Sequence, residues 1–397
     1  MESDAARPGG RLLVLGAGPA QIGLLRRARE LGLFVVAADR DPRAPGFEYA
    51  DRRALVSAED EHGIARLAEA ERVDGLIAPG IDWPVAVAAR VAAQIGLLHP
   101  ISPETAVLAT SKVRQRERLA AAGVQQPSWR LVRHHEPDLQ VPCVVKPPDR
   151  QGQRGLSVVR RLEDLGPAIR RALAESRSRS CLVEELVAGP ELTVNGFSAA
   201  GRFQALTVTD RIVAESPAFG VALAHVWPAR DGGEAAAAAA ERAVHGLGIA
   251  DGPSYTQVRV APDGPRVVEV AARLGGGHDA ELCAAATGVD LNGLAVHAAL
   301  GWEIEEKSLR GDFRAGGACV RFLLAPEGEL AGVAGLEEAA ALPGVVEVRV
   351  YRAPGHPFGP LRRGADRAGA VLATGETPEE ALTTADRAAE RVVFAVT

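Results

Sequence analysis

The chain has 397 residues, of which 47% are hydrophobic and 24% are charged, and its formal net charge is -6. This length exceeds one ordinary hydrophobic core, so two or three domains are expected, and the composition is that of a folded globular protein. The acidic balance argues against a nucleic-acid partner, because binding phosphates needs a basic face. No apolar run reaches the ~20 residues of a membrane span, which argues against a membrane partner.

The chain also lacks the sequence features of a secreted protein. Met1 to Gly10 carry charges and no apolar core, so this segment does not resemble a secretory signal. Cysteines lie far apart and form no CxxC pair, at Cys143, Cys181, Cys283 and Cys319. A zinc site or a disulfide framework is therefore not expected, and reduced thiols fit a cytoplasmic protein.

Strands and helices alternate in the first third of the chain. Residues 11–18 have the pattern of a buried strand that ends in glycines, and 20–31 have the period of an amphipathic helix. Further strands are predicted at 33–39 and 74–80, the second followed by a helix at 85–97. This alternation predicts a parallel sheet wrapped by helices, with ligands at the carboxyl ends of its strands.

The pattern changes in the middle of the chain. Ser111 opens a basic helix over 112–123, and from Val141 short strands follow one another through glycine turns, which predicts an antiparallel α+β region. The tail from about Phe313 holds further short strands and a last helix over 376–392.

The first glycine cluster, GAGPAQIG, lies between a strand and a helix. A dinucleotide-binding fingerprint would need a third glycine at position 21 after Gly16 and Gly18, but Gln21 stands there and the next glycine is Gly23. Asp39 lies where a ribose-binding acid is expected. The spacing makes a nicotinamide cofactor the poorer interpretation, and a tight turn packed against a helix is an equal alternative.

The second cluster, VVKPPDRQGQRG, places Lys146 at the end of an apolar strand, where its charge needs a partner. Residues 151–155, including Gly152 and Gly155, form a small-sided hairpin tip that can offer backbone N–H groups to phosphates. The alternative is a surface hairpin with a solvated lysine.

In the third cluster, CLVEELVAGPELTV, Glu184 and Glu185 close a strand before a glycine turn and Glu191. Free backbone groups near Val187 can read an adenine edge, and a carboxylate one turn further can accept from ribose hydroxyls. The alternative is a strand end with solvated acids.

The fourth cluster is a predicted hairpin followed by glycines. If the hairpin is symmetric about Asp263, then Gln257 and Glu269 lie opposite each other, and Val260 pairs with Arg266. Two facing oxygen-bearing side chains suit a hard cation such as Mg²⁺.

Arg273 follows four residues after Glu269. The glycines at 275–277 then allow a polyanion to approach the backbone, and a helix starts at His278 and Asp279.

In this order, the four clusters resemble the ATP-grasp superfamily over essentially the whole chain, and most closely the carboxylate–amine ligases that include L-amino-acid ligases. The resemblance implies ATP and Mg²⁺, for which Mn²⁺ can substitute. It implies a catalytic role for Arg273 and Lys146, and metal binding by Glu269 and Gln257. The nucleotide residues that it implies are Lys112, Lys146, Gly152, Gly155, Glu184, Glu185, Val187 and Glu191. The substrate residues that it implies are Asp82, Tyr255, Arg273, Gly276, Gly277 and His278.

The resemblance implies three domains and a reaction. An α/β pre-ATP-grasp domain with a parallel sheet is expected over 1–110, an α+β ATP-grasp domain over 111–305 with a lid at about 125–185, and a C-terminal α+β lobe over 306–397. The expected activity joins a small-molecule carboxylate, through an acyl phosphate, to an amine, which is most simply an amino acid. The resemblance is compatible with a homodimer.

Two departures from the family pattern leave alternatives open. The family usually has an acid where this chain has Gln257, and many members have asparagine where it has Ala271. The number of metal ions bound, one or two, therefore stays open. A nucleotide-binding pseudoenzyme is an alternative to an active ligase. A carboxylase or formyl-transfer enzyme of the same superfamily is another, and a nicotinamide-dependent oxidoreductase is the weakest. The sequence names neither the acid nor the amine.

Overall fold

A computed structural model describes residues 9–134, 138–150 and 152–397. Met1 to Pro8 lie outside the described residues, and they make up most of the segment that is not expected to be a secretory signal. Gln151, in the predicted phosphate loop, also lies outside the described residues.

The N-terminal part is a parallel sheet of order β3-β2-β1-β4, as the alternating pattern predicted. Its strands are β1 (Arg11–Leu15), β2 (Phe34–Ala38), β3 (Arg52–Ala54) and β4 (Gly75–Ile77). The helices that cover it are α1 (Ile22–Glu30), α2 (Glu61–Glu71), α3 (Asp82–Ile95) and α9 (Leu291–Ala299). Because side chains alternate along a strand, Leu13 and Leu15 pack in the cluster with α2 and α3, while Leu12 and Val14 pack in the cluster with α1 and α9.

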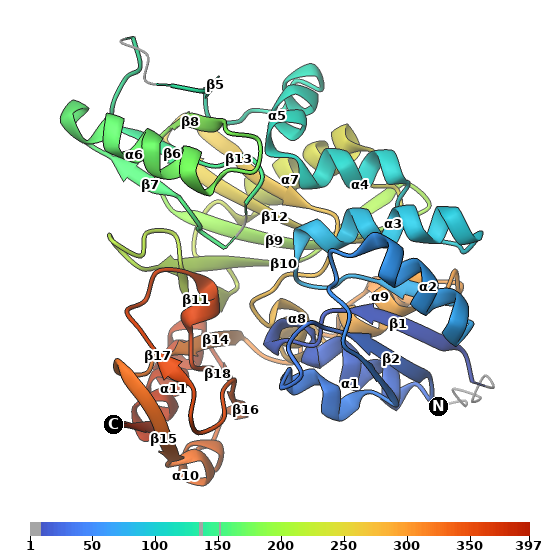
Figure 1. Ribbon diagram of the computed structural model, residues 1–397. Coiled ribbons are helices and arrows are strands. Elements are labelled where there is room, and N and C mark those ends of the chain that lie inside the picture. Colours follow the sequence, from blue (N-terminus) through green and yellow to red (C-terminus); the bar gives the residue numbers. More distant parts are fainter. Residues whose placement is uncertain (1–8, 135–137, 151) are drawn as a thin grey trace.

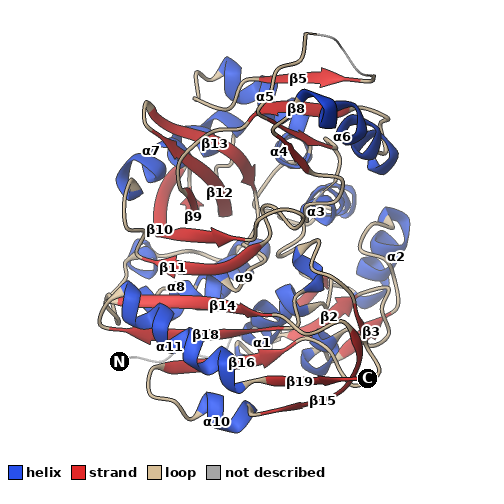
Figure 2. Cartoon of the chain, turned by 90° about the vertical axis from the view of Figure 1, so that its left-hand side faces the viewer, coloured by secondary structure: helices blue, strands red, loops and turns tan. Residues whose placement is uncertain are grey.

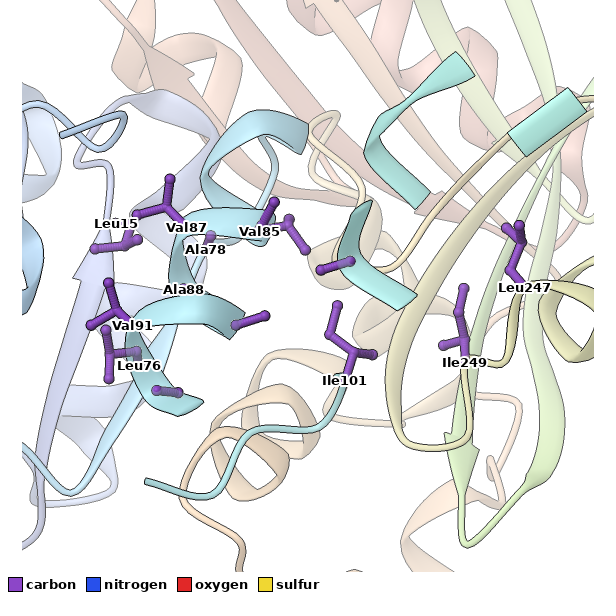
Figure 3. Packing of buried hydrophobic residues seen from close by; sticks show 14 of the residues in the cluster. Leu15, Leu76, Ala78, Val85, Val87, Ala88, Val91, Ile101, Leu247 and Ile249 are labelled. Carbon is purple, nitrogen blue, oxygen red and sulfur yellow. The ribbon is translucent and has the colours of Figure 1, made fainter. Parts of the chain in front are cut away.

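The core between β1 and α3 continues into the middle of the protein. Figure 3 shows Val87 and Val91 of α3 beside Leu15, and it shows Ile101 between this helix and Ile249. Residues of the N-terminal parallel sheet and of the large sheet in the middle of the protein therefore belong to one apolar cluster.

The central element is an antiparallel eight-stranded sheet of order β13-β12-β9-β10-β11-β14-β18-β16. Its first part comprises β9 (Glu191–Ala199), β10 (Arg202–Val213), β11 (Ala222–Trp227), β12 (Gly252–Ala261) and β13 (Gly264–Ala271). The helices around it are α4 (Pro103–Thr110), α5 (Lys112–Ala121), α7 (Gly233–Leu247) and α8 (Asp279–Thr287). The alanine run lies in α7, whose Ala236 and Ala240 pack on Leu192 and Val258 of the sheet.

A smaller antiparallel sheet of order β5-β8-β6-β7 lies at the top of Figure 1. It consists of β5 (Trp129–Val132), β6 (Cys143–Lys146), β7 (Ser157–Val159) and β8 (Cys181–Glu185), covered by α6 (Leu162–Glu175). Val145 and Cys181 of the sheet pack with Leu165 and Ile169 of α6 in a separate core. We call this unit the lid.

The C-terminal segment continues the large sheet and adds a small one. Figure 2 shows β14 (Gly317–Leu323), β18 (Gly369–Gly375) and β16 (Val345–Val350) running on from β11, with α11 (Pro378–Arg391) beside them. The three-stranded sheet β17-β15-β19 and one short helix complete it, with β15 (Gly328–Ala334), β17 (Pro357–Phe358), β19 (Val393–Val396) and α10 (Leu336–Ala340). The predicted fold class is confirmed, and the predicted domain boundaries stay a prediction.

The β12–β13 hairpin corrects one predicted register. Gln257 does pair with Glu269, but Arg266 pairs with Arg259, so the predicted pairing of Val260 with Arg266 is wrong. The register shifts between Gln257 and Val258, which is the signature of a β-bulge at Val268. Ala261 pairs with Gly264, so the turn is shorter than the loop expected around Asp263. The bulge adds one residue to β13, and Gln257 and Glu269 therefore still pair.

Candidate active site

The side chains predicted to bind phosphate and metal meet where α5 approaches the end strand of the large sheet. Nζ of Lys112, the first residue of α5, lies 2.6 Å from Oε1 of Glu269 on β13. Burial alone would raise the pKa of Glu269, but Lys112, Lys146 and Arg273 outweigh it and the pKa falls to about 2. Three cations thus surround the Glu269 carboxylate, and two of them, Lys146 and Arg273, also contact the carboxylates of Glu184 and Asp82.

Gln257, Tyr255, Arg273 and Asp82 continue from Glu269 as one connected group. Gln257 pairs with Glu269 across the hairpin, and its Nε2 donates to the hydroxyl of Tyr255 at 3.2 Å. The guanidinium of Arg273 lies 5.3 Å from the centroid of the Tyr255 ring and donates to Oδ1 of Asp82 at 2.7 Å. The structure therefore brings the predicted metal residues together with three of the predicted substrate residues.

Lys146 ends β6 beside a buried carboxylate. Its Nζ lies 2.7 Å from Oε2 of Glu184, and Nε of Arg116 lies 2.9 Å from Oε1 of the same carboxylate. Burial alone would raise the pKa of Glu184, but Arg116 and Lys146 lower it to about 2. Burial also lowers the pKa of Lys146, partly against the attraction of Glu184. Because both oxygens of Glu184 are engaged, its contact with adenine stays a prediction.

Arg116 was missed by the sequence interpretation, although its position is central. Besides Glu184, its guanidinium donates to the carbonyl oxygens of Val267 at 3.1 Å and Val268 at 2.6 Å. The neighbouring Gln115 donates to the carbonyl oxygen of Val270 and accepts from its N–H. The end strand β13 is thus completed by side chains of α5. Since Lys112 and Arg116 are four residues apart on one helix, their common face was the signal available in the sequence.

The predicted phosphate loop connects β6 and β7, which pair as an antiparallel hairpin. Gly152 and Gly155 both have positive φ, +65° and +70°, a conformation that favours glycine. A Cβ on Gly155 would lie 2.8 Å from Pro147, whereas nothing surrounds the position on Gly152. The loop tip is exposed, so its role at phosphates stays a prediction.

The remaining predicted nucleotide residues lie at the junction of the lid and the large sheet. Oε2 of Glu185 accepts from the N–H of Ser128 at 3.1 Å, and Val187 is buried. Glu191 starts β9, where its two carboxylate oxygens contact Arg211 and Arg259. A ribose would have to share Glu191 with these arginines.

The glycine segment before α8 packs closely, and this explains its composition. A Cβ on Gly276 would lie 2.9 Å from the carbonyl oxygen of Gly80, and one on Gly277 would lie 2.9 Å from Nε2 of His225. His278 has a φ of +60° and hydrogen-bonds to the hydroxyl of Tyr351 through its Nε2. The predicted substrate residues Gly276, Gly277 and His278 therefore lie where the N-terminal domain, the large sheet and the C-terminal segment meet.

The first glycine cluster has a structural role. Gln21 is 1% exposed, donates to the carbonyl oxygen of Pro79 at 2.7 Å and lies against Gly16 and Gly18. Asp39 accepts from the N–H of Ala17 at 2.8 Å. Both observations support the tight turn that was the alternative to a cofactor site.

The predicted metal residues offer one carboxylate and one amide, and not a protein cage. Within residues 9–134, 138–150 and 152–397, no group of three or more His, Cys, Asp and Glu side chains is placed to hold a metal. The Glu269 carboxylate and the Gln257 amide lie opposite each other on adjacent strands. One carboxylate and one amide oxygen, with the phosphates of a nucleotide and water, form a donor set that Mg²⁺ accepts.

Two family models match the sequence of this chain. A model described as an ATP-grasp domain matches residues 139–281, which include Lys146, Glu184 and Arg273. The chain carries an ATP-grasp domain. A model described as the L-amino acid ligase C-terminal domain 2 matches residues 321–397, so the resemblance to the ATP-grasp superfamily and its L-amino-acid ligases is confirmed.

Curated relatives match parts of this chain. The uncharacterized protein y4rH of Sinorhizobium fredii is 30% identical over 312 residues, which are 74% of this chain and 63% of that protein. The formate-dependent phosphoribosylglycinamide formyltransferase of Burkholderia thailandensis is 32% identical over 178 residues, 42% of this chain and 43% of the enzyme. The matched regions thus span less than two thirds of these relatives.

Solved structures share the fold over nearly the whole chain. The L-amino acid ligase from Bacillus licheniformis has a TM-score of 0.84 at 21% identity, covering 98% of this chain and 99% of that one. The phosphoribosylglycinamide synthetase from Anaerococcus prevotii has a TM-score of 0.79 at 17% identity, covering 98% and 100%.

Among the helices in the described ranges, none is long and apolar enough to cross a bilayer.

Proposed function

We propose that this chain is an ATP-dependent carboxylate–amine ligase that forms an amide or peptide bond, with an amino acid as one of its substrates. The observation that carries the proposal is the presence in one chain of an ATP-grasp domain and the second C-terminal domain of L-amino acid ligases. The cluster of Lys112, Lys146, Glu269 and Arg273 supports it, because a triphosphate needs several cations around one site.

In the proposed reaction, an oxygen of the donor carboxylate attacks the γ-phosphorus of ATP, and ADP leaves. The amine nitrogen of the acceptor then attacks the carbonyl carbon of the acyl phosphate and loses a proton, and inorganic phosphate leaves with that carboxylate oxygen. Such a transfer depends on positioning and charge neutralisation, which Lys112, Lys146 and Arg273 would supply. Mg²⁺ held by Glu269 and Gln257 would add charge neutralisation on the phosphates. Closure of the lid and its loop at 152–155 would exclude water that hydrolyses the intermediate.

The test is a screen of carboxylate and amine pairs, starting with the L-amino acids, read as ADP release with mass detection of the product. Ligase activity requires that ADP release depend on both substrates and that the product equal donor plus acceptor minus water. Glu269→Gln serves as the control for background ATP hydrolysis. ATP binding without any substrate-dependent ADP release would favour a pseudoenzyme instead.

A formyl-transfer reaction is the second candidate, since a formate-dependent formyltransferase is among the relatives. It shares the acyl phosphate and differs in using formate as the donor. Adding formate and a ribonucleotide amine to the same screen separates the two candidates, because only one donor will accelerate ADP release.

A further inference from the structure

Several buried polar atoms on one face of the large sheet have no hydrogen-bond partner among the described residues. They include Oδ1 of Asn195, Oγ1 of Thr209, Nε of Arg211 and Nδ1 of His225. Cross-strand pairs share a face, and Arg211 pairs with His225 while Thr209 pairs with Thr193, two residues before Asn195. These side chains therefore form one polar surface across β9, β10 and β11.

This polar surface is continuous with the candidate active site. Asn195 pairs with Tyr255, and Thr193 pairs with Gln257, which in turn pairs with Glu269. Oδ1 of Asp279, at the start of α8, accepts from Nδ2 of Asn195 at 3.3 Å. One end of the surface thus reaches the predicted metal residues, and the other reaches His225. Because buried polar groups in proteins are nearly always satisfied, unpaired atoms next to the candidate active site call for a partner, which is water or the polar part of a substrate.

Arg367 lies at the far end of this surface. Its guanidinium stacks on the Phe322 ring, 3.6 Å from the centroid, and donates to the carbonyl oxygens of Gly364 at 2.8 Å and Ala222 at 3.4 Å. The same Phe322 ring packs against His225 at 5.9 Å between centroids. Arg211 donates to the carbonyl oxygen of Gly220 at 2.9 Å, so both arginines donate to the short segment 220–222 where β11 begins.

The charges at this end are not balanced. Arg211 and Arg259 share the single carboxylate of Glu191, and Arg367 makes no ion pair in the described part of the chain. Asp279 supplies the other negative charge, but it accepts from Asn195 and from the N–H of Gly277. Burial lowers the pKa of Arg367, and the repulsion from Arg211 lowers it as well, while Tyr351 and Asp279 act in the opposite direction.

We propose that Arg367, beside Arg211, is the subsite for the free carboxylate of an amino-acid acceptor, whose amine faces the acyl phosphate at the Glu269 end. The proposal rests on the ligase function proposed above. The carboxylate of the donor substrate reacts with ATP at the Glu269 end of the surface. A second anion site at the Arg367 end therefore suits the acceptor, which keeps its own carboxylate. Asn195, Thr209 and His225 lie between the two ends and would contact the rest of the acceptor.

The test compares each L-amino acid with its α-carboxamide as acceptor, in wild type, Arg367→Gln, Arg367→Lys and the control Arg362→Gln. Arg362 is exposed and lies five residues away, so the control makes the same chemical change outside the surface. Wild type and Arg362→Gln should prefer the acid. In Arg367→Gln this preference should fall by about 10-fold or more, the cost of losing a charged hydrogen bond. Arg367→Lys should restore part of it.

The ratio of acid to amide within one variant cancels any loss of folded protein. An acid preference in Arg367→Gln equal to that of wild type would overturn the proposal, as would a wild type that uses acid and amide equally. The donor half-reaction, trapped with hydroxylamine as a hydroxamate, is measured in parallel. If hydroxamate forms and no amino acid acts as acceptor, the subsite is wrong while acyl activation stands. If no hydroxamate and no product form with any donor, the ligase proposal itself fails.

Discussion

Nε of Arg116 lies 2.9 Å from Oε1 of Glu184, and both side chains are almost completely buried, at 2% and 3% exposure. The pair joins α5, next to the large sheet, to β8 in the lid. Glu184 also holds Lys146 at 2.7 Å. The position of a proposed catalytic lysine thus depends on an arginine that contacts neither ATP nor substrate in the proposed mechanism.

Arg116→Met should destabilise the protein by about 3–5 kcal/mol, because it leaves the buried carboxylate of Glu184 with one partner fewer. Unfolding in urea, followed by fluorescence, measures the change. Arg114→Met is the matched control, since Arg114 is exposed on the same helix, and it should stay within about 0.5 kcal/mol of wild type. If both substitutions change the free energy of unfolding equally, the buried contact of Arg116 with Glu184 does not stabilise the protein.

Arg273→Ala should lower kcat by about 10²-fold or more, while the affinity for ATP changes far less. The charge on the transferring group and the carbonyl oxygen grows only in the transition state, so a preorganised donor acts mainly on rate. Arg273→Lys should not restore the rate, because a point charge replaces the planar donor that holds Asp82. Steady-state ADP release with both substrates gives kcat and KM. If Arg273→Ala and Glu269→Ala both keep wild-type kinetics, the active site lies elsewhere.

Gln257→Glu should lower the melting temperature of the metal-free protein and tighten Mg²⁺ binding. Two carboxylates would face each other across the hairpin, where Lys112, Lys146 and Arg273 offset only part of their repulsion, and a bound cation would relieve the rest. Thermal melting with and without Mg²⁺, and a Mg²⁺ titration of ADP release, measure both effects. If Mg²⁺ binding is unchanged and activity is lost, Gln257 contacts substrate and not metal.

Stability should fall as the pH drops from about 6.5 to about 4, in part because of His225. Burial lowers the pKa of His225 to about 4, from an unfolded value of about 6.5. The folded state therefore binds fewer protons in this window, and the stability from this group is present above pH 6.5 and lost as the pH falls through 4. His225→Gln should reduce the slope by up to about 1.4 kcal/mol per pH unit in urea unfolding. His245→Gln, at an exposed position of α7, should leave the slope unchanged.

The sequence predicted the parts of the site that lie within one segment. The strand ends at Lys146 and at Glu184 and Glu185 follow from local patterns. So does the facing of Gln257 and Glu269, although this pairing arises through a bulge and not through a symmetric turn. Arg116 was missed because its partners, Glu184 and the carbonyls of Val267 and Val268, are brought to it only by tertiary folding. Local patterns carry no information on such distant pairs.

The polar surface was missed for a related reason. Asn195, Thr209 and His225 each lie alone in an ordinary strand pattern, where a polar residue indicates a solvent-exposed face. The structure covers this face, so those residues are buried and only their shared register identifies them as a group. The order of strands in the sheet, which the sequence does not specify, decides that register.

The central claim is that the donor carboxylate is activated as an acyl phosphate. The most direct measurement uses a donor labelled with oxygen-18 in both carboxylate oxygens, with ATP, Mg²⁺ and the amine, and mass analysis of the released phosphate. Because one carboxylate oxygen bonds to the γ-phosphorus and leaves with it, each inorganic phosphate should carry one oxygen-18, with ADP as the nucleotide product. Product formed with unlabelled phosphate, or with AMP in place of ADP, would contradict the account.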